Sequence, residues 1–106
     1  MVISGGVNIY PAEIEAVLLN MPEVADGCVF GIPDDEYGEK LMAVVQPVPG
    51  ADIDAAKVQQ FLAKELANYK VPHVVEFRKE LPRHDSGKLF KRVLREPYWA
   101  GREKRI

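Results

Sequence analysis

The sequence predicts an α+β fold in which an N-terminal β-hairpin is followed by a small three-stranded sheet packed by about three helices. Two β-branched apolar stretches, residues 24–32 and 40–48, flank a turn rich in Pro, Asp and Gly and predict an antiparallel strand pair. Two other segments repeat apolar residues at helical spacing. The chain has 106 residues, which is enough for one hydrophobic core and too few for two domains.

The predicted hairpin covers residues 1–10, where Gly5-Gly6 separates two short β-branched strands. Gly-Gly in this position indicates a tight turn, because both residues adopt positive φ at little steric cost. Glycines also let another molecule approach the backbone closely. The hairpin is therefore a candidate contact surface, although a plain turn explains the same residues.

Two amphipathic helices are predicted on either side of the strand pair. Pro11 suits the first position of a helix over residues 11–21. Its apolar face consists of Ile14, Val17, Leu18 and Met21. Asp54 can cap a longer helix over residues 54–70 by accepting backbone N–H bonds. The apolar stripe of this second helix consists of Val58, Phe61, Leu62, Leu66 and Tyr69.

Residues 73–77 predict the third strand, and the polar loop LPRHDSGKL follows at residues 81–89. A final helix is expected to end at Pro97 and to turn Phe90, Val93 and Leu94 inward. Lys88 stands at the start of that helix, where the dipole disfavours a cation by a few tenths of a kcal/mol, on the order of usual end effects. A lysine in this place suits an anion outside the domain, although the loop alone favours a solvated surface lysine.

Composition excludes several classes of function. The net charge of −2 does not favour nucleic-acid binding, and the basic stretch after residue 87 is explained by a solvated helix face. There is no run of about 18 apolar residues and no secretory signal. The single Cys28 forms no internal disulfide and indicates a buried apolar residue in a reducing, cytoplasmic setting. The two histidines, eleven residues apart (His73 and His84), make a poor metal site, so no metal ligands are predicted.

The residues provide no self-contained active site. The SGK of the loop is not part of a P-loop, because Pro82 and Leu89 occupy positions that require Gly and Ser or Thr. We identify no Ser/His/Asp set and no closely spaced carboxylate pair.

Two motifs carry a family resemblance when they are taken together. ISGGVNIYPAEIE at residues 3–15 and LPRHDSGKLFKRVLR at residues 81–95 resemble the paired motifs of the C-terminal subdomain of adenylate-forming enzymes. These are the acyl-CoA synthetases, the adenylation domains of peptide synthetases and the luciferases. The resemblance covers essentially the whole chain, including GIPDDEYGE and LANYKVP, and looks closest to fatty-acyl-CoA ligases because REPYW follows. It implies that residues 1–106 are a C-terminal lid domain whose N-terminal ATP-binding domain is absent, so that the isolated chain is inactive.

The resemblance implies a catalytic role for Lys88 in the first half-reaction, in which a substrate carboxylate attacks the α-phosphate of ATP. Its flexible ammonium would neutralise charge that builds between the two anions. The loop residues Pro82, Arg83, Ser86 and Gly87 would support it. Acetylation, which removes that charge, switches off some members of the family and is a hypothesis for Lys88.

For the second half-reaction, the resemblance implies that the domain rotates and turns the hairpin toward the active site. The residues that would then line the channel for the CoA pantetheine are Ser4, Gly5, Gly6 and Asn8. Glu13 also matches the motif, but a glutamate in the first turn of a helix explains it, and we interpret it as structural.

The resemblance further implies ATP, Mg²⁺ and CoA as cofactors, bound mainly by the N-terminal domain of the same enzyme. Expected partners are that domain, a carboxylic and most simply a fatty acid, and CoA, with no nucleic acid and at most peripheral membrane association. Two alternatives stay open. One is an adenylation-domain lid that passes acyl groups to a carrier protein. The other is a free-standing binding module whose basic C-terminal face contacts nucleic acid or anionic lipid.

Overall fold

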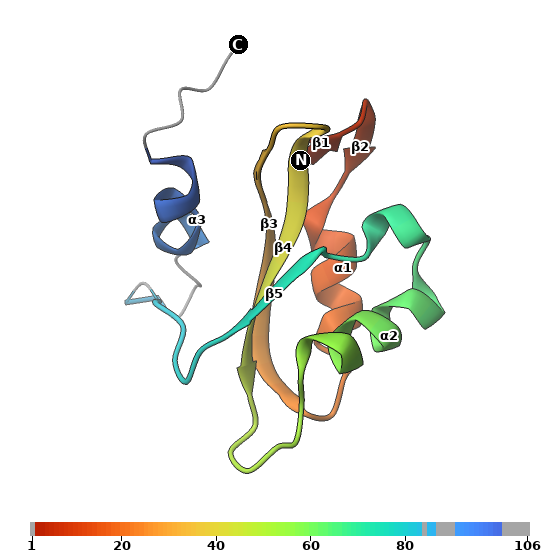
Figure 1. Ribbon diagram of the computed structural model, residues 1–106. Helices are drawn as coiled ribbons and strands as arrows, with labels where there is room; N and C mark the ends of the chain where they lie inside the picture. The colour runs from red at the N-terminus through yellow and green to blue at the C-terminus, as the bar shows by residue number, and fades with distance from the viewer. Residues whose placement is uncertain (1, 84, 87–90, 101–106) are drawn as a thin grey trace.

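The computed structural model describes residues 2–83, 85–86 and 91–100, and the predicted α+β class is confirmed (Figure 1). A two-stranded hairpin precedes a three-stranded sheet with α-helices on both of its faces. In chain order the elements are β1 (Val2–Ser4), β2 (Val7–Ile9), α1 (Pro11–Leu18), β3 (Val24–Asp34), β4 (Gly38–Pro47), α2 (Ala55–Glu65), the 3₁₀-helix η1 (Asn68–Lys70), β5 (Val74–Phe77) and α3 (Lys91–Trp99).

The three-stranded sheet is mixed and has β4 at its centre. β3 pairs with β4 antiparallel, with Val29 opposite Ala43, and β5 pairs with β4 parallel. All of residues 41–45 are buried, as a central strand requires. β3 forms one edge of the sheet, which explains how it accommodates Pro33 near its end.

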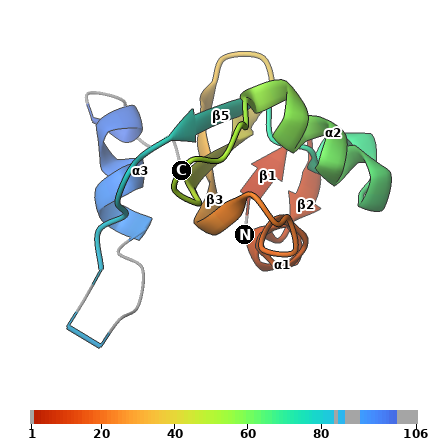
Figure 2. The ribbon, with the colours of Figure 1, turned by 90° about the horizontal axis from the view of Figure 1, so that it is seen from below.

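Helices cover the sheet from both sides, with α1 and α2 on one face and α3 on the other (Figures 1 and 2). Because side chains alternate along a strand, β3 and β4 supply apolar residues to both layers. The residues of these two strands that face α1 and α2 are Val24, Val29, Leu41, Ala43 and Val45. Those that face α3 are Cys28, Phe30, Ile32, Met42 and Val44, joined by Leu81 and Leu94.

Both predicted amphipathic helices are shorter than the sequence pattern suggests. The first ends at Leu18, although Met21 beyond it is still buried. The prediction of one helix over residues 54–70 is wrong, because α2 stops at Glu65 and the extended Leu66 leads into η1. This break exposes Tyr69, which was expected to face the core.

The segment after η1 is extended and is held against α2 by a side chain of that helix. Pro72 disfavours helical backbone at Val71, which is extended. The chain then turns back along α2, where the side-chain amide of Gln59 donates hydrogen bonds to the carbonyls of Pro72 (3.0 Å) and His73 (3.3 Å).

Helix α3 continues through Pro97 to Trp99, so the prediction that it ends at Pro97 is wrong. The helical pattern persists in the bond from the Ala100 N–H to the Glu96 carbonyl, at 2.9 Å. Proline has no backbone N–H, so the carbonyl four residues earlier, here that of Val93, receives no hydrogen bond from it. Val93 is 48% exposed, contrary to the expectation that it faces inward, so this carbonyl lies on a side of the helix that water reaches.

Two side-chain hydrogen bonds hold the last turn of α3 on the sheet. The Tyr98 hydroxyl donates to Glu76 of β5 at 2.8 Å, and the Trp99 indole N–H donates to the Gly31 carbonyl of β3 at 2.9 Å. Burial, and to a smaller extent the Glu76 carboxylate, raises the pKa of Tyr98 and keeps its hydroxyl protonated as a donor. These tertiary bonds compensate for the proline inside the helix.

Cys28 lies between the sheet and α3 and is 1% exposed, as expected for a buried apolar residue. Burial raises the pKa of its thiol from 9.0 to about 11, and the nearby Lys91 only partly offsets this effect. Above the ordinary thiol pKa, the unfolded chain therefore loses a proton that the folded chain keeps.

We expect the free energy of unfolding to fall as the pH rises between about 9 and 11, by at most about 1.4 kcal/mol per pH unit from this thiol. The stabilisation from the protonated thiol is complete below this window and is lost as the pH rises through it. Urea denaturation of the wild type and of Cys28→Ala, across pH 8 to pH 11, measures the contribution as a difference. A difference that does not change with pH would contradict the prediction.

Candidate functional site

The N-terminal hairpin has the tight turn that its glycines predict. Gly5 and Gly6 have φ angles of 57° and 83°, and Ser4 pairs with Val7 across them. Positive φ at both central residues is the conformation of a type I′ turn. The turn is fixed to the β3–β4 hairpin, because the Gly5 N–H donates to the Tyr37 carbonyl at 3.0 Å.

The glycine turn presents bare backbone to its surroundings. Gly5, Gly6 and Asn8 are exposed, and Ser4 is half-buried. A Cβ added to Gly6 would meet no atom within 4 Å, whereas one added to Gly5 would lie 3.3 Å from the Tyr37 ring. Space for a narrow ligand is therefore open beside Gly6.

Four exposed apolar or aromatic side chains belong to the hairpin, to the residue that follows it and to the neighbouring β3–β4 turn. They are Ile3, Val7, Tyr10 and Tyr37, with exposed fractions of 46%, 42%, 57% and 50%. Ile3 and Val7 lie on opposite faces of the hairpin, because Ile3 pairs with Asn8 and Val7 pairs with Ser4. Their residue types are those of buried strand positions, so their exposure could not be predicted from the sequence.

The loop over residues 81–89 is described only in part. Leu81 is buried in the layer under α3, Pro82 is half-buried, and Arg83 and Ser86 are exposed. The predicted catalytic Lys88 and its neighbour Gly87 lie outside the described residues.

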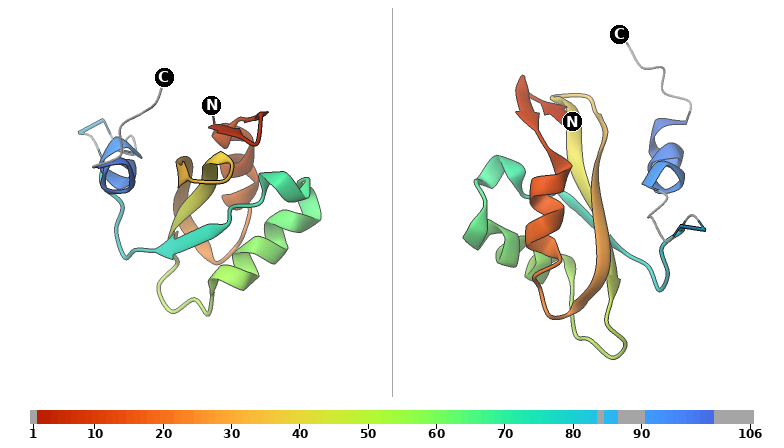
Figure 3. Two further views of the ribbon diagram at one scale, coloured as in Figure 1. Left: turned by 45° about the horizontal axis from the view of Figure 1, so that its top comes forward. Right: turned by 180° about the vertical axis from the view of Figure 1, so that it is seen from behind.

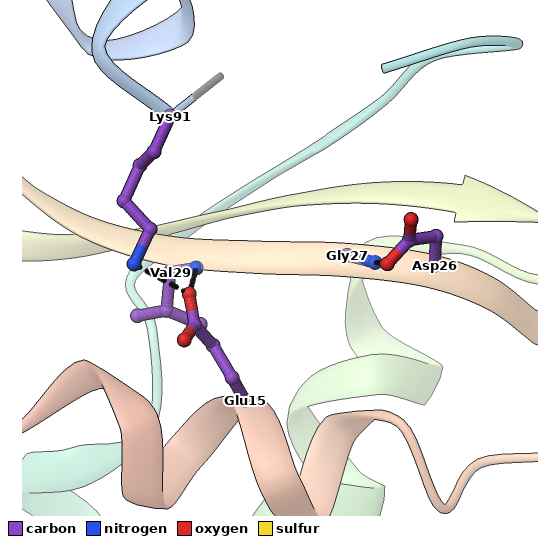
Figure 4. Close-up of polar contacts among 5 residues, drawn as sticks. All are labelled: Glu15, Asp26, Gly27, Val29 and Lys91. Carbon is purple, nitrogen blue, oxygen red and sulfur yellow. Dashed lines mark hydrogen bonds and ion pairs between the residues drawn. The ribbon is translucent and has the colours of Figure 1, made fainter. Parts of the chain in front are cut away.

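Two ion pairs flank the segment that contains Lys88, and both reach the outer edge of β3. On the N-terminal side, Arg83 pairs with Asp26. On the C-terminal side, Lys91 Nζ lies 2.6 Å from Glu15 Oε2 (Figure 4). The positions of these residues in the sequence do not predict that they form ion pairs, although Glu15 and Lys91 each belong to one of the two motifs.

Both carboxylates also accept a hydrogen bond from the backbone of β3 (Figure 4). Glu15 Oε2 accepts from the Val29 N–H, and Asp26 Oδ1 accepts from the Gly27 N–H, each at 2.8 Å. These bonds fix the carboxylates, and the fixed carboxylates in turn orient the two cations.

The structure does not bring the two predicted site segments together. The glycine turn lies beside the tip of the β3–β4 hairpin, while the described loop residues 82–83 and 85–86 lie beyond the end of β5, on the side of α3 (Figures 1 and 3). The domain therefore offers two separate surfaces.

The described residues do not form an enclosed site of their own. The hollow beside α2 is a shallow one of about 420 Å³, and the polar side chain of Gln59 within its lining already binds backbone carbonyls. Within the described ranges, no three His, Cys, Asp or Glu side chains come close enough to hold a metal ion. None of the helices in these ranges has the length and apolar character needed to cross a membrane.

The sequence model of the AMP-binding enzyme C-terminal domain matches residues 13–88. The chain belongs to this family. Over 91% of its length, this AMP-binding C-terminal domain is 47% identical to the 3-[(3aS,4S,7aS)-7a-methyl-1,5-dioxo-octahydro-1H-inden-4-yl]propanoyl:CoA ligase of Rhodococcus jostii. The match covers 19% of that ligase. Over 99% of its length, the domain is 38% identical to the fatty acid–[acyl-carrier-protein] ligase ScoC of Streptomyces coeruleorubidus, and the match covers 20% of that ligase.

The fold agrees with the sequence comparison. The solved structure described as Mycobacterium tuberculosis fatty acyl CoA synthetase superposes with a TM-score of 0.86, at 41% identity, over 94% of this domain and 20% of that chain. The AMP-binding C-terminal domain thus spans about a fifth of the length of these relatives.

The left-handed backbone at Gly5 should restrict which residues this domain tolerates there. Gly5→Ala is expected to lower the free energy of unfolding by about 1–2 kcal/mol, because alanine is strained at positive φ. Gly5→Asn adds the same Cβ next to Tyr37 but tolerates this φ, so it should cost less. Chemical denaturation of both variants measures the difference. Equal losses would assign the cost to the Tyr37 contact instead.

Proposed function

We propose that this chain is the mobile C-terminal domain of an acyl-CoA ligase. Such an enzyme joins a carboxylic acid to ATP, giving acyl-AMP and pyrophosphate, and then transfers the acyl group to the CoA thiol with release of AMP. The observation that carries the proposal is the family membership, together with two motif segments at separate places on the surface. Two half-reactions served in turn by two surfaces require the domain to rotate between them.

Lys88 is proposed to serve the adenylation step. Attack of one anion, the carboxylate, on another, the α-phosphate, builds negative charge that a positioned cation stabilises. A lysine supplies a compact charge on a flexible stem, which can enter a site formed by a different domain and leave it again.

The glycine turn is proposed to serve thioester formation. Its exposed backbone and the open space beside Gly6 suit a narrow chain such as pantetheine. Ser4 and Asn8, on the strands that flank the turn, would supply polar contacts. Exposed apolar side chains on the hairpin face that meets the N-terminal domain would be covered when the turn faces the active site.

ATP, Mg²⁺ and CoA would be bound mainly by the larger domain that precedes this one in the full-length enzyme. The described residues contain no cluster of metal-binding side chains, so we assign no Mg²⁺ ligand among them. The acid is proposed to be a fatty or related hydrophobic acid, as the names of the ligases similar to this domain suggest.

In the full-length enzyme, Lys88→Ala is expected to lower acyl-adenylate formation by about 10²–10³-fold, because a charge donor to the transition state is removed. Formation of acyl-CoA from supplied acyl-adenylate should be nearly unchanged, because Lys88 has left the site by then. Pyrophosphate release measures the first step and acyl-CoA production the second. Lys79→Ala, which removes an exposed lysine outside the loop, is the control. Equal losses in both steps would contradict the assigned role.

A second candidate acceptor is an acyl carrier protein, favoured by the 38% identity to a fatty acid–[acyl-carrier-protein] ligase. The carrier presents the same pantetheine thiol as CoA, so the glycine turn fits either acceptor. We expect supplied acyl-adenylate to be converted faster with CoA than with a carrier protein that bears its pantetheine arm. The reverse preference, measured as thioester formed at equal acceptor concentrations, would establish the carrier as the acceptor.

A further inference from the structure

We propose that Glu39 is a positioning residue for thioester formation, because its carboxylate holds the N-terminal hairpin against the tip of the β3–β4 hairpin. The inference rests on the role proposed above for the glycine turn as a wall of the pantetheine channel. Glu39 does not need to touch the thiol or the acyl group. It would act through the backbone of β1, the strand that leads into the turn.

The chain from β1 into the glycine turn is attached to the β3–β4 hairpin at two points, and Glu39 makes one of them. The Ile3 N–H donates to Glu39 Oε2 at 3.2 Å, and the Gly5 N–H donates to the Tyr37 carbonyl at 3.0 Å. The two donors are two residues apart, a span of at most about 7 Å. One bond would let the hairpin swivel about it, whereas bonds at two separate points define its direction.

Apolar contacts hold the base of the hairpin on the domain without fixing the direction of its tip. Val2 of β1 pairs with Ile9 of β2, and both side chains are buried in the core beneath α1 and α2. Burial of apolar surface supplies adhesion, but it is non-directional. Hydrogen bonds require defined distances and angles, so the bonds to Ile3 and Gly5 set the direction that burial leaves open.

Gly31 of β3 leaves the room that the Glu39 carboxylate occupies. A Cβ built on Gly31 would lie 2.5 Å from Glu39 Oε1 and 3.1 Å from both methyl groups of Val2. Glycine inside a strand weakens it, and it is used where other groups approach the backbone closely. Here a carboxylate of β4 and a side chain of β1 both approach the backbone of β3. The glycine therefore belongs to the same contact as Glu39.

The direction of β1 decides where the glycine turn lies. Gly5 and Gly6 follow Ile3 by two and three residues, so a change in the direction of the strand moves the turn with it. A misplacement of about 1 Å in a reacting complex can cost on the order of 10²-fold in rate. Adenylation is proposed to use the other surface of the domain. Loss of the Glu39 contact should therefore slow thioester formation and spare adenylation.

The test uses the full-length enzyme with Glu39→Leu, which keeps a side chain of similar size but removes the acceptor for the Ile3 N–H. With supplied acyl-adenylate, kcat/KM for CoA is expected to fall about 10-fold. Acyl-adenylate formation, measured as pyrophosphate release, should stay within about twofold. Glu39→Gln keeps an oxygen that can accept from Ile3 and should recover most of the lost rate. Glu36→Leu, which removes an exposed carboxylate from the adjoining turn, is the matched control and should have no effect.

Gly31→Ala gives a second readout, because its Cβ would displace the Glu39 carboxylate while Glu39 itself is unchanged. It should also slow thioester formation and spare adenylation. If both changes act through one contact, Gly31→Ala combined with Glu39→Leu should be no slower than the slower single variant. Additive losses would overturn the proposal, as would equal losses in both half-reactions. An unchanged rate in Glu39→Leu, or an equal loss in Glu39→Gln, would overturn it as well.

Gly6→Asn separates failure of this proposal from failure of the proposed function. Asparagine tolerates the positive φ of Gly6, and its side chain would enter the open space beside the turn. Slow thioester formation in Gly6→Asn with a normal rate in Glu39→Leu would refute the positioning role alone. Normal thioester formation in Gly6→Asn would refute the role of the turn and, with it, the need to position it.

Discussion

Strand β4 is buried on both faces along residues 41–45, and its side chains alternate between two apolar layers. A strand of this kind is stable only if both layers are covered, so the chain must supply helices to each side of the sheet. α1 and α2 cover one layer, and α3 returns from the far end of the sequence to cover the other. This return places Leu81 and Leu94, from the described parts of the second motif, on the side of the sheet opposite α1 and α2.

The two surfaces differ in how firmly they are built. The glycine turn is part of a hairpin whose backbone bonds directly to the β3–β4 tip, so its shape is set by main-chain hydrogen bonds. Among its described residues, the loop after β5 has a buried Leu81 and an ion pair from Arg83 to Asp26. Main-chain bonds hold a hairpin more rigidly than an exposed side-chain ion pair holds a loop.

The sequence predicted the features that depend on local pattern, such as the glycine turn, the strand pair and the capped start of α2 at Asp54. It failed where distant residues decide the outcome. After α2 the chain folds back so that Gln59 binds the carbonyls of Pro72 and His73. α3 passes through Pro97, and Tyr98 and Trp99 bond to the sheet. The pairing of Lys91 with Glu15 was hidden for the same reason, since it requires knowing that α1 and α3 meet at one strand edge.

The Glu15 carboxylate at Val29 also bears on how the domain behaves in a crowded solution. An uncovered strand at the margin of a sheet offers free N–H groups on which a strand of a second molecule can assemble, the first step toward aggregates. By accepting from Val29, and by drawing the long side chain of Lys91 across this margin, Glu15 removes one such donor and adds charge beside it. The contact that joins α1 to α3 therefore also protects the protein against self-association.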